Sequence, residues 1–220
     1  MRLKKETYHV QVTDMLRNRI MTGKLKVGDK INENELCEIL GISKTPLREA
    51  LRVLSVEGLI KLIPHRGAFV TKPTFEEIAE MFDVMSLLEG FCAREACSKL
   101  TPKDFDRLER LHAKLEDNFE KRDQEAYILA NNQYHSLVQK IAGNRTLNQI
   151  VNGLRKKILL YRFQSLNLPE RFEHSIFEHR DLLEAFRNRD HESAETLMIK
   201  HLQNQSKALS ALVQRSQDAS

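Results

Sequence analysis

The sequence predicts a mainly α-helical protein in which a small basic module precedes a larger, all-helical one. Three observations support this prediction. The 220 residues include only 8 Gly and 5 Pro, so helix-breaking positions are few. Apolar residues recur at helical spacing along most of the chain, and strand-like alternation is confined to one short stretch before residue 72. With 41% hydrophobic residues, the chain can fill a sizeable core.

Charge is divided unevenly along the chain. Residues 1–72 hold 14 Lys and Arg against 8 Asp and Glu, a net charge of +6, whereas the remainder holds 21 against 23, a net charge of −2. A basic module of this kind indicates a polyanionic partner. We therefore place a hinge at Lys72-Pro73 and expect domains over residues 1–72 and 73–220.

Several classes of protein are excluded by composition. No apolar run approaches the roughly 20 residues needed to cross a bilayer, and the charged segment Met1–Glu6 has no apolar stretch behind it. These features predict a soluble cytoplasmic protein with no membrane partner. Cys37, Cys92 and Cys97 are an odd number and fall within helical patterns, so we interpret them as reduced packing residues.

Helical signals dominate the first half of the basic module. We expect a first helix from near Val10 to residues 22–23 and a short second helix over residues 33–40, which a glycine ends. A third helix follows, because Ser43 stands where an N-cap belongs and Pro46 falls in the first turn, where a missing N–H costs little. Its expected buried positions are Leu47, Ala50, Leu51 and Leu54. A helix, a glycine turn and a helix form the unit that places its second helix in the DNA major groove.

A strand-like hairpin follows the third helix. Residues 59–63 and 68–71 read as two strands around a turn at Pro64–Gly67, which completes a winged helix-turn-helix. Arginine can contact guanine through two hydrogen bonds, and Lys and Thr can bond phosphates or base edges. The candidate DNA-binding residues, on the outer face of the third helix and at the wing tip, are Lys44, Thr45, Arg48, Arg52, Arg66 and Gly67. A single exposed charge is usually only solvated, but this set predicts double-stranded DNA binding.

The rest of the chain predicts an antiparallel all-α bundle. Thr101-Pro102 before Asp104 is a cap-plus-proline signal for a helix start. We expect a short helix from Thr74 that leads into residues 83–99, followed by helices over 102–121, 123–142, 145–164, 169–187 and 191–214. Each has an apolar stripe, such as Val84, Leu87, Leu88, Phe91 and Cys92.

Three histidines fall on the inward faces of three separate helices. His135 lies on the apolar stripe of its helix, and His179 and His201 lie on those of theirs. Asn131 precedes His135 by one helical turn and could add an oxygen ligand. Imidazoles on facing helices with one oxygen suit a divalent metal ion such as Zn or Ni. Hydrogen-bonded core histidines are the alternative interpretation, and the spacing alone leaves both open.

Five segments of the basic module together form a longer pattern: Gly23–Lys30, Leu36, Leu40–Leu51, Glu57–Leu59 and Arg66–Val70. Through these segments the module resembles the DNA-binding domain of the GntR family of bacterial transcription regulators. This similarity implies that Arg48 is the leading base contact, with Thr45 and Lys44 beside it and Gly67 at the wing. Lys44 stands where the family usually has Arg, and Asn34 stands where Arg is frequent. Because Lys lacks the two-pronged Arg contact, a different operator is expected.

The helical remainder, over residues 75–213, resembles the FCD effector domain of the FadR subfamily. The matching segments are Leu87–Glu89, Tyr134-His135, Ala142–Asn144, Glu178–Arg180, Ala185-Phe186 and Lys200–Leu202. In that domain an Asp and three His commonly bind a metal, and a small organic acid completes the coordination. The resemblance implies His135, His179 and His201 as ligands, with Asn131 where Asp is usual.

One further departure concerns the effector. Met85 stands where many FCD domains carry an Arg that faces the effector pocket, so we name Arg155 and Arg162 as replacement candidates for binding a carboxylate. Solvated surface arginines are the alternative for both.

The sequence thus predicts a homodimeric transcription regulator that binds a pseudo-palindromic operator and responds to a small carboxylate, and not an enzyme. By the family resemblance, repression relieved by the effector is expected. Two alternatives remain open. The signal could be the metal ion itself, or three His with an open position could form a metal-dependent hydrolase. Against the hydrolase, no Asp or Glu is clearly placed as a general base.

Overall fold

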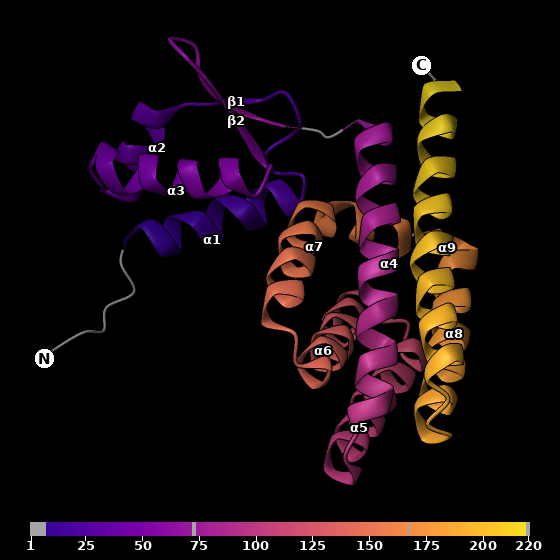
Figure 1. The fold of residues 1–220 in the computed structure, drawn as a ribbon. Helices are drawn as coiled ribbons and strands as arrows, with labels where there is room; N and C mark the ends of the chain where they lie inside the picture. Colours follow the sequence, from indigo (N-terminus) through magenta and orange to yellow (C-terminus); the bar gives the residue numbers. More distant parts are fainter. Residues whose placement is uncertain (1–7, 72–73, 167, 219–220) are drawn as a thin grey trace, which may run out of the picture. The chain divides into compact units, whose positions relative to one another are not determined.

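The computed structural model describes residues 8–71, 74–166 and 168–218. It divides into two units, Met1–Thr74 and Phe75–Ser220, each with its own buried hydrophobic side chains. Figure 1 colours the first unit indigo to violet and the second magenta to yellow. The predicted hinge at Lys72-Pro73 lies outside the described residues.

The N-terminal unit combines helices with a small antiparallel sheet. Its elements are α1 (Tyr8–Met21), β1 (Lys30–Ile31), α2 (Glu33–Leu40), α3 (Lys44–Val56), β2 (Ile60–Ile63) and β3 (Gly67–Val70). The strand order is β1-β3-β2, and the pairs Lys61↔Phe69 and Lys30↔Phe69 fix the register. The winged helix-turn-helix is therefore confirmed. The sequence did not predict β1, because two residues are too few to show alternation.

Local capping explains where α2 and α3 begin and end. The Asn32 side chain accepts a hydrogen bond from the Glu35 backbone N–H, and Gly41 ends α2 in the left-handed conformation at φ 62°. Ser43 occupies the N-cap position of α3, but its side chain makes no capping hydrogen bond, which corrects the role expected for it. Pro46 lies in the first turn of α3, as predicted.

The core of the N-terminal unit lies between α1, α3 and the sheet. Leu47, Ala50, Leu51 and Leu54 of α3 are buried as predicted, together with Leu16 and Ile20 of α1. One ion pair ties α1 to the end of α3: Arg17 donates from Nε and Nη2 to the two oxygens of Glu57, each at 2.9 Å. This two-pronged contact holds the C-terminal end of α3 against α1.

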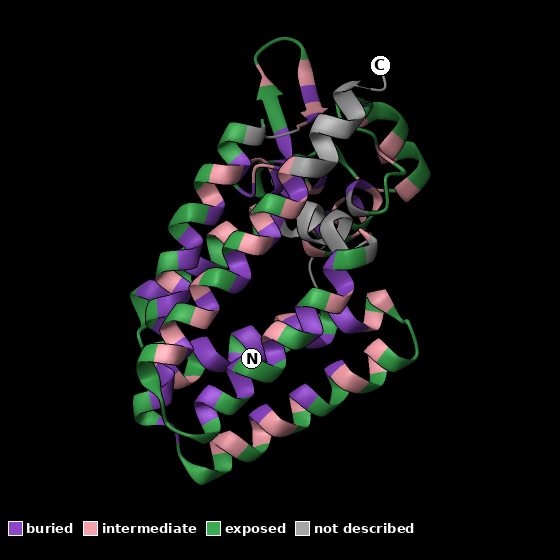
Figure 2. Cartoon of the chain, turned by 90° about the vertical axis from the view of Figure 1, so that its right-hand side faces the viewer, coloured by how far each residue is buried: buried purple, intermediate pink, exposed green. Residues whose placement is uncertain are grey.

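The second unit is an all-α bundle. Its helices are α4 (Phe75–Lys99), α5 (Pro102–Glu120), α6 (Gln124–Ala142), α7 (Arg145–Leu166), α8 (Pro169–Arg187) and α9 (His191–Asp218). The side chains of Thr101 and Asp123 cap α5 and α6 by accepting from Asp104 N and Ala126 N. Figure 2 shows buried residues along the sides of these helices that face one another.

Helix α4 differs from its prediction in two ways. It is one continuous helix from Phe75, because residues 75–83 contain no Gly or Pro to break it. The predicted apolar stripe is buried only in part: Cys92 is buried, but the exposed fractions of Val84, Leu87 and Phe91 are 50%, 63% and 43%. The buried face joins Cys92 with Ile78, Phe82, Met85 and Ala96. Apolar residues lie on two faces of α4, so periodicity alone does not identify the core face.

Helices α4 and α9 run side by side in Figure 1. Their closest approach involves Gly90, where an added Cβ would lie 2.5 Å from Cγ1 of Ile199. Only a glycine leaves room for that side chain.

Two further sequence predictions can be compared with the structure. Cys37, Cys92 and Cys97 form no disulfide, and the latter two are buried. Burial raises the pKa of Cys92 to about 12, and the nearby Glu89 adds to this, so its thiol stays protonated and unreactive. Among the described residues, none of the helices has the length and apolarity needed for a membrane span.

Candidate functional site

A hollow of about 600 Å³ in the N-terminal unit brings the start of α3 next to the wing. Lys44 and Arg48 of α3 line it together with Arg66 and Gly67 of the wing. Its lining also includes Lys30 on β1. Basic side chains from three elements therefore face one concave surface, which is the arrangement that a phosphate backbone requires.

Arg48 is exposed and forms an ion pair with Glu33. Its Nε donates to Oε2 of Glu33 on α2 at 3.0 Å, and 62% of the Arg48 side chain remains accessible. Near the wing tip, the Arg66 guanidinium lies 5.8 Å from the centre of the Phe69 ring. His65 and Gly67 have φ angles of 60° and 101°, which produce the tight turn of the wing.

The other two DNA-binding candidates, Thr45 and Arg52, are exposed on α3 but do not line the hollow. The structure adds Lys30 and His65 to the lining, neither of which the sequence analysis selected. Lys30 was missed because its position depends on β1, the strand that was not predicted.

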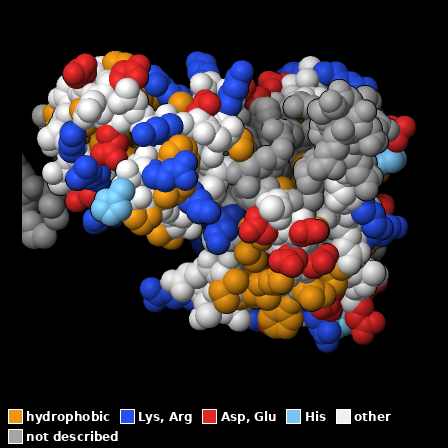
Figure 3. Space-filling view, turned by 90° about the horizontal axis from the view of Figure 1, so that it is seen from above, with side chains coloured by type: hydrophobic (Ala, Val, Ile, Leu, Met, Phe, Trp, Pro, Cys, Tyr) orange, Lys and Arg blue, Asp and Glu red, His pale blue; other side chains and the backbone are white. Residues whose placement is uncertain are grey.

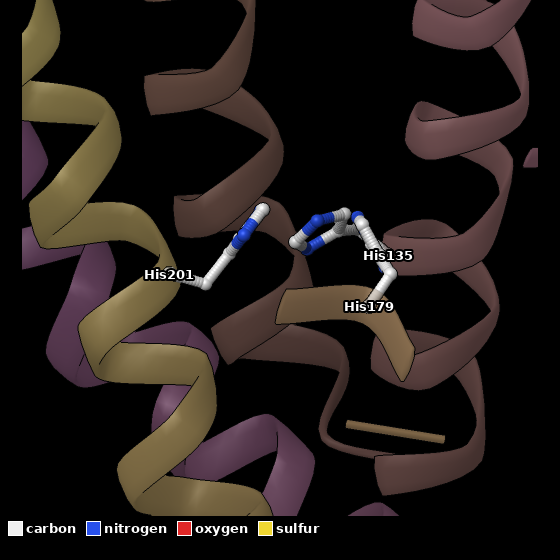
Figure 4. Close-up of side chains that lie close together, drawn as sticks. All are labelled: His135, His179 and His201. Carbon is white, nitrogen blue, oxygen red and sulfur yellow. The ribbon is translucent and has the colours of Figure 1, made fainter. Parts of the chain in front are cut away.

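His135, His179 and His201 converge in the interior of the helical unit. They come from α6, α8 and α9, and one ligand atom of each lies within 4.8 Å of those of the others. Ring centres are 4.9 to 5.5 Å apart, and Figure 4 shows the three imidazoles turned toward a common space. All three residues are at most 1% exposed.

A buried carboxylate orients His135. Its Nδ1 lies 2.8 Å from Oε2 of Glu89 on α4, and Glu89 in turn receives two hydrogen bonds from Arg155 on α7, at 2.6 and 2.8 Å. Burial by itself would raise the pKa of Glu89, but the charges and hydrogen bonds of Arg155 and His135 reverse this and hold it well below its ordinary value. The carboxylate thus accepts at Nδ1–H, which leaves Nε2 as the nitrogen that His135 offers to the cluster.

His201 is oriented by a second, similar chain of contacts. Its Nδ1 lies 2.6 Å from Oε2 of Glu178, and Arg171 Nη2 donates to the same oxygen at 2.7 Å. Burial opposes ionisation of Glu178, but His201 and Arg171 lower its pKa to about 2. Two Arg–Glu–His chains, on different helices, therefore aim two imidazoles at one space.

His179 has no such partner. Both of its ring nitrogens are buried without a hydrogen-bond partner in the described part of the chain. Its ring lies edge-on to Tyr134, with centres 5.0 Å apart. Burial, with a smaller contribution from His201 and His135, holds the pKa of His179 well below its ordinary value, so the ring is neutral and can donate a lone pair.

These observations fit a metal ion. A buried imidazole with two unpaired nitrogens is costly unless a ligand binds it, and the carboxylates behind His135 and His201 are the outer partners that metal-bound histidines usually have. Asn131, the predicted oxygen ligand, is 2% exposed on α6, one helical turn before His135. The cluster therefore has the donor set of a metal site.

Comparison with known families agrees with both units. The model of bacterial regulatory proteins of the gntR family matches residues 9–70, and that of the FCD domain matches residues 80–204. The chain belongs to the GntR family and carries an FCD domain. It is a transcription regulator and not an enzyme, which removes the hydrolase alternative.

Relatives and solved structures give the same assignment. The regulator is 26% identical over 195 residues to the uncharacterised HTH-type transcriptional regulator YdhC of Bacillus subtilis (strain 168), with 88% of this chain and 87% of YdhC covered. It is 24% identical over 208 residues to the HTH-type transcriptional repressor RspR of Escherichia coli (strain K12), with 94% and 91% covered. The solved structure of E. coli McbR/YncC superposes with a TM-score of 0.77 at 25% identity, covering 95% of this chain and all of McbR.

The structure places one of the two proposed carboxylate-binding arginines of the GntR regulator, Arg155, differently from expectation. Arg155 is 7% exposed, and all three of its nitrogens are occupied by Glu89 and Asn132. It orients His135 and has little capacity left for a ligand. Arg162 lies on α7, but its side chain is outside the described residues.

Sequence reasoning missed the residues behind the histidines. Glu89 and Arg171 are buried, and Glu178 is half-buried, with its side chain 16% exposed. Glu178 directly precedes His179 in the sequence, and in the structure its carboxylate contacts His201 and Asn204 of α9.

Proposed function

We propose that this GntR regulator is a repressor whose operator affinity is controlled by a small carboxylate that binds a divalent metal ion in the FCD unit. The observation that carries this proposal is the convergence of His135, His179 and His201, with one ligand atom of each within 4.8 Å of the others. The name of the relative RspR, a transcriptional repressor, supports repression as the sense of regulation. Residues 1–72 would bind DNA, and residues 73–220 would sense and dimerise.

The three histidines and Asn131 would hold the metal. Neutral imidazoles with one amide oxygen suit Zn or Ni better than Mg or Ca, which prefer carboxylate and carbonyl oxygens. When bound, the ion would supply a Lewis-acidic position for a carboxylate oxygen. The protein's own task is to keep the imidazoles neutral and oriented. Burial holds the pKa of His135 and His179 low, and Glu89 and Glu178 orient His135 and His201.

On the DNA side, α3 would enter the major groove with Arg48 as the leading base contact and Lys44, Thr45 and Arg52 beside it. Arg66 and Gly67 of the wing would approach the backbone or minor groove, and Lys30 would add a phosphate contact from β1. Two such domains in a homodimer would bind a pseudo-palindromic operator. Much of the affinity would come from phosphate contacts and would fall steeply with salt.

The exposed face of α4 supports a homodimer. Val84, Leu87 and Phe91 form an exposed apolar stripe, and Figure 3 shows hydrophobic side chains gathered on the helical unit beside acidic ones. Glu80 lies seven residues before Leu87 and Arg94 seven after it, and both are exposed. Two copies of α4 crossing antiparallel at Leu87 would therefore place each Glu80 opposite Arg94 of the second copy, as a two-fold interface requires.

Replacing Leu87 with Glu tests this interface. We expect the variant to sediment as a monomer, because like charges would meet at the two-fold axis, whereas the exposed Ile150→Glu on α7 should leave the dimer intact. If both variants remain dimeric in sedimentation velocity, the dimer uses another face.

The control of DNA binding is tested with the full-length protein and an oligonucleotide that it selects from a random pool. Fluorescence anisotropy would compare the apo protein, the Zn- or Ni-loaded protein, and the loaded protein with each of a series of small organic acids. We expect release only with metal and acid together. A full response to the metal alone would replace the carboxylate with the ion as the signal, and no response under any condition would contradict the proposal.

A further inference from the structure

Arg171 of α8 is a buried cation with unused hydrogen-bonding capacity. Its side chain is 4% exposed, and its Nη2 contacts Oε2 of Glu178 at 2.7 Å and the backbone oxygen of His201 at 3.4 Å. Its Nε and Nη1 are buried without a partner among the described residues. Since Nε carries one proton and Nη1 carries two, three of the five guanidinium N–H groups are unused.

Arg155 provides an internal comparison. It also pairs with a glutamate behind a cluster histidine, but it places Nε and Nη2 on Glu89 and Nη1 on Asn132. A buried arginine in this unit can therefore satisfy all of its nitrogens with protein atoms. Arg171 leaves two of its nitrogens without a protein partner, and a buried cation with unpaired N–H groups is a candidate anion site.

Arg171 is adjacent to the histidine cluster. Its Nη2 lies 3.5 Å from Nδ1 of His201, so one imidazole ring separates the guanidinium from the space that the three histidines enclose.

The charges around the site indicate which charge the ligand should have. The charged groups in contact with the histidines form two ion pairs, Glu89 with Arg155 and Glu178 with Arg171, each with no net charge. The oxygen ligand, Asn131, is neutral. A divalent cation would therefore add two positive charges to a buried site without an ionised ligand, and a dianion would neutralise them.

We propose that the effector is a small dicarboxylate, with one carboxylate on the metal and the other hydrogen-bonded to Nη1 of Arg171. Arginine suits this role because its two N–H groups on Nη1 can hold the ligand while Nη2 keeps its contact with Glu178. The inference rests on the proposed metal site and extends it by naming the ligand class and the residue that selects it.

The test uses full-length, Zn-loaded protein and isothermal titration calorimetry with malonate, succinate and glutarate. Acetate, propionate and butyrate are the matched monocarboxylates. We expect at least one dicarboxylate to bind about tenfold or more tightly than its matched monocarboxylate, the difference that one buried charge-assisted contact provides. Equal binding of the two series would overturn the role of Arg171 and leave the metal site intact.

Three variants test whether Arg171 is the residue that causes the dicarboxylate preference. Arg171→Lys keeps a charge beside Glu178 but has a single nitrogen, which cannot contact Glu178 and reach the ligand as two separate nitrogens do, and we expect it to abolish the dicarboxylate preference with unchanged Zn content. The double variant R171Q/E178Q removes both partners of the ion pair, so that neither is left buried and unpaired. Because it also removes the carboxylate that orients His201, it is titrated at saturating Zn, where it should show the same loss of the dicarboxylate preference. Arg180→Lys, exposed on the same helix, should retain the preference.

The outcomes separate the two proposals. If Arg171→Lys keeps the dicarboxylate preference, or if it loses Zn as well, Arg171 only supports His201 and the inference is overturned. If the wild-type protein takes up no Zn, the metal site and the inference both fail.

Discussion

Glu89 contacts both His135 and Arg155 in the interior of the helical unit, and this double contact defines its role. The carboxylate holds one imidazole in a fixed orientation while the arginine holds the carboxylate. Outer partners of metal ligands of this kind typically contribute a factor of about 10 to 100 in metal affinity.

We therefore expect Glu89→Gln to weaken Zn binding by about 10- to 100-fold, because the amide no longer favours the Nδ1–H tautomer of His135. Competition with a chromophoric chelator measures the change. Glu95→Gln on the same helix, whose side chain pairs with Lys99 at the surface, is the matched control and should bind Zn like the wild type. Equal affinity in all three proteins would mean that Glu89 is only a partner for Arg155.

Arg48 is the residue on which DNA specificity should depend most. Replacing it with Ala should weaken binding to the selected operator by about 1 to 3 kcal/mol, the value of one two-pronged contact to a base. Binding to random DNA should change much less, and anisotropy titrations of both duplexes at one salt concentration provide the comparison. An equal loss on both duplexes would make Arg48 a phosphate contact.

At the residue scale, the sequence predicted the three histidines that converge but not the residues that orient them. His135, His179 and His201 lie on apolar stripes, and a polar residue on such a stripe is visible in the sequence. Glu89 and Arg155 are paired across 66 positions, and no periodicity within one helix reports that pairing. Arg155 was consequently interpreted as a ligand-binding residue.

The α4–α9 pair is the element-scale feature most sensitive to a small change. Gly90→Val would place a Cβ 2.5 Å from Ile199 Cγ1, and the resulting overpacking should lower the free energy of unfolding by about 1 to 3 kcal/mol. Urea denaturation measures the loss. Adding Ile199→Ala should recover part of it by making room, and strictly additive losses would show that the two side chains do not compete for space.

Helix α5 contributes a buried histidine away from the cluster, His112, which should make stability depend on pH. Burial lowers the pKa of His112 below its ordinary value of 6.5, and attraction to Glu116 offsets only part of this. The unfolded chain therefore binds the proton more readily than the folded one, so stability is lost as pH falls below about 6.5, by at most about 1.4 kcal/mol per pH unit for one group.

Urea denaturation at about pH 7.5 and about pH 5.5, with chelator present, checks this prediction. His112→Gln cannot be protonated and should lose less stability on acidification than the wild type. His191→Gln, at the exposed start of α9, should respond as the wild type does. If the His112 variant loses as much stability as the wild type, other groups account for the acid sensitivity.

At the element scale, the sequence predicted what depends on local signals. The ends of α2, α5 and α6 follow from caps and glycines within a few residues. It did not predict β1, which exists only because it pairs with β3, nor which of two apolar faces of α4 is buried. Both depend on contacts between distant parts of the chain.

At the scale of the whole molecule, a DNA-binding unit and an FCD domain are joined in one chain. An effector can change operator affinity only if it binds unequally to the DNA-competent and the incompetent arrangements. The charge division in the sequence, +6 in residues 1–72 and −2 beyond, already indicated this separation of tasks. The identity of the signal depends on the buried site.

Metal content of the full-length protein tests the central claim most directly. After dialysis against Zn and then against buffer, mass spectrometry of the metal should give one ion per chain for the wild type and for His174→Ala, an exposed residue of α8. His179→Ala should lose the ion while circular dichroism shows unchanged helix content. Stable Zn binding by His179→Ala, or none by the wild type, would contradict the account.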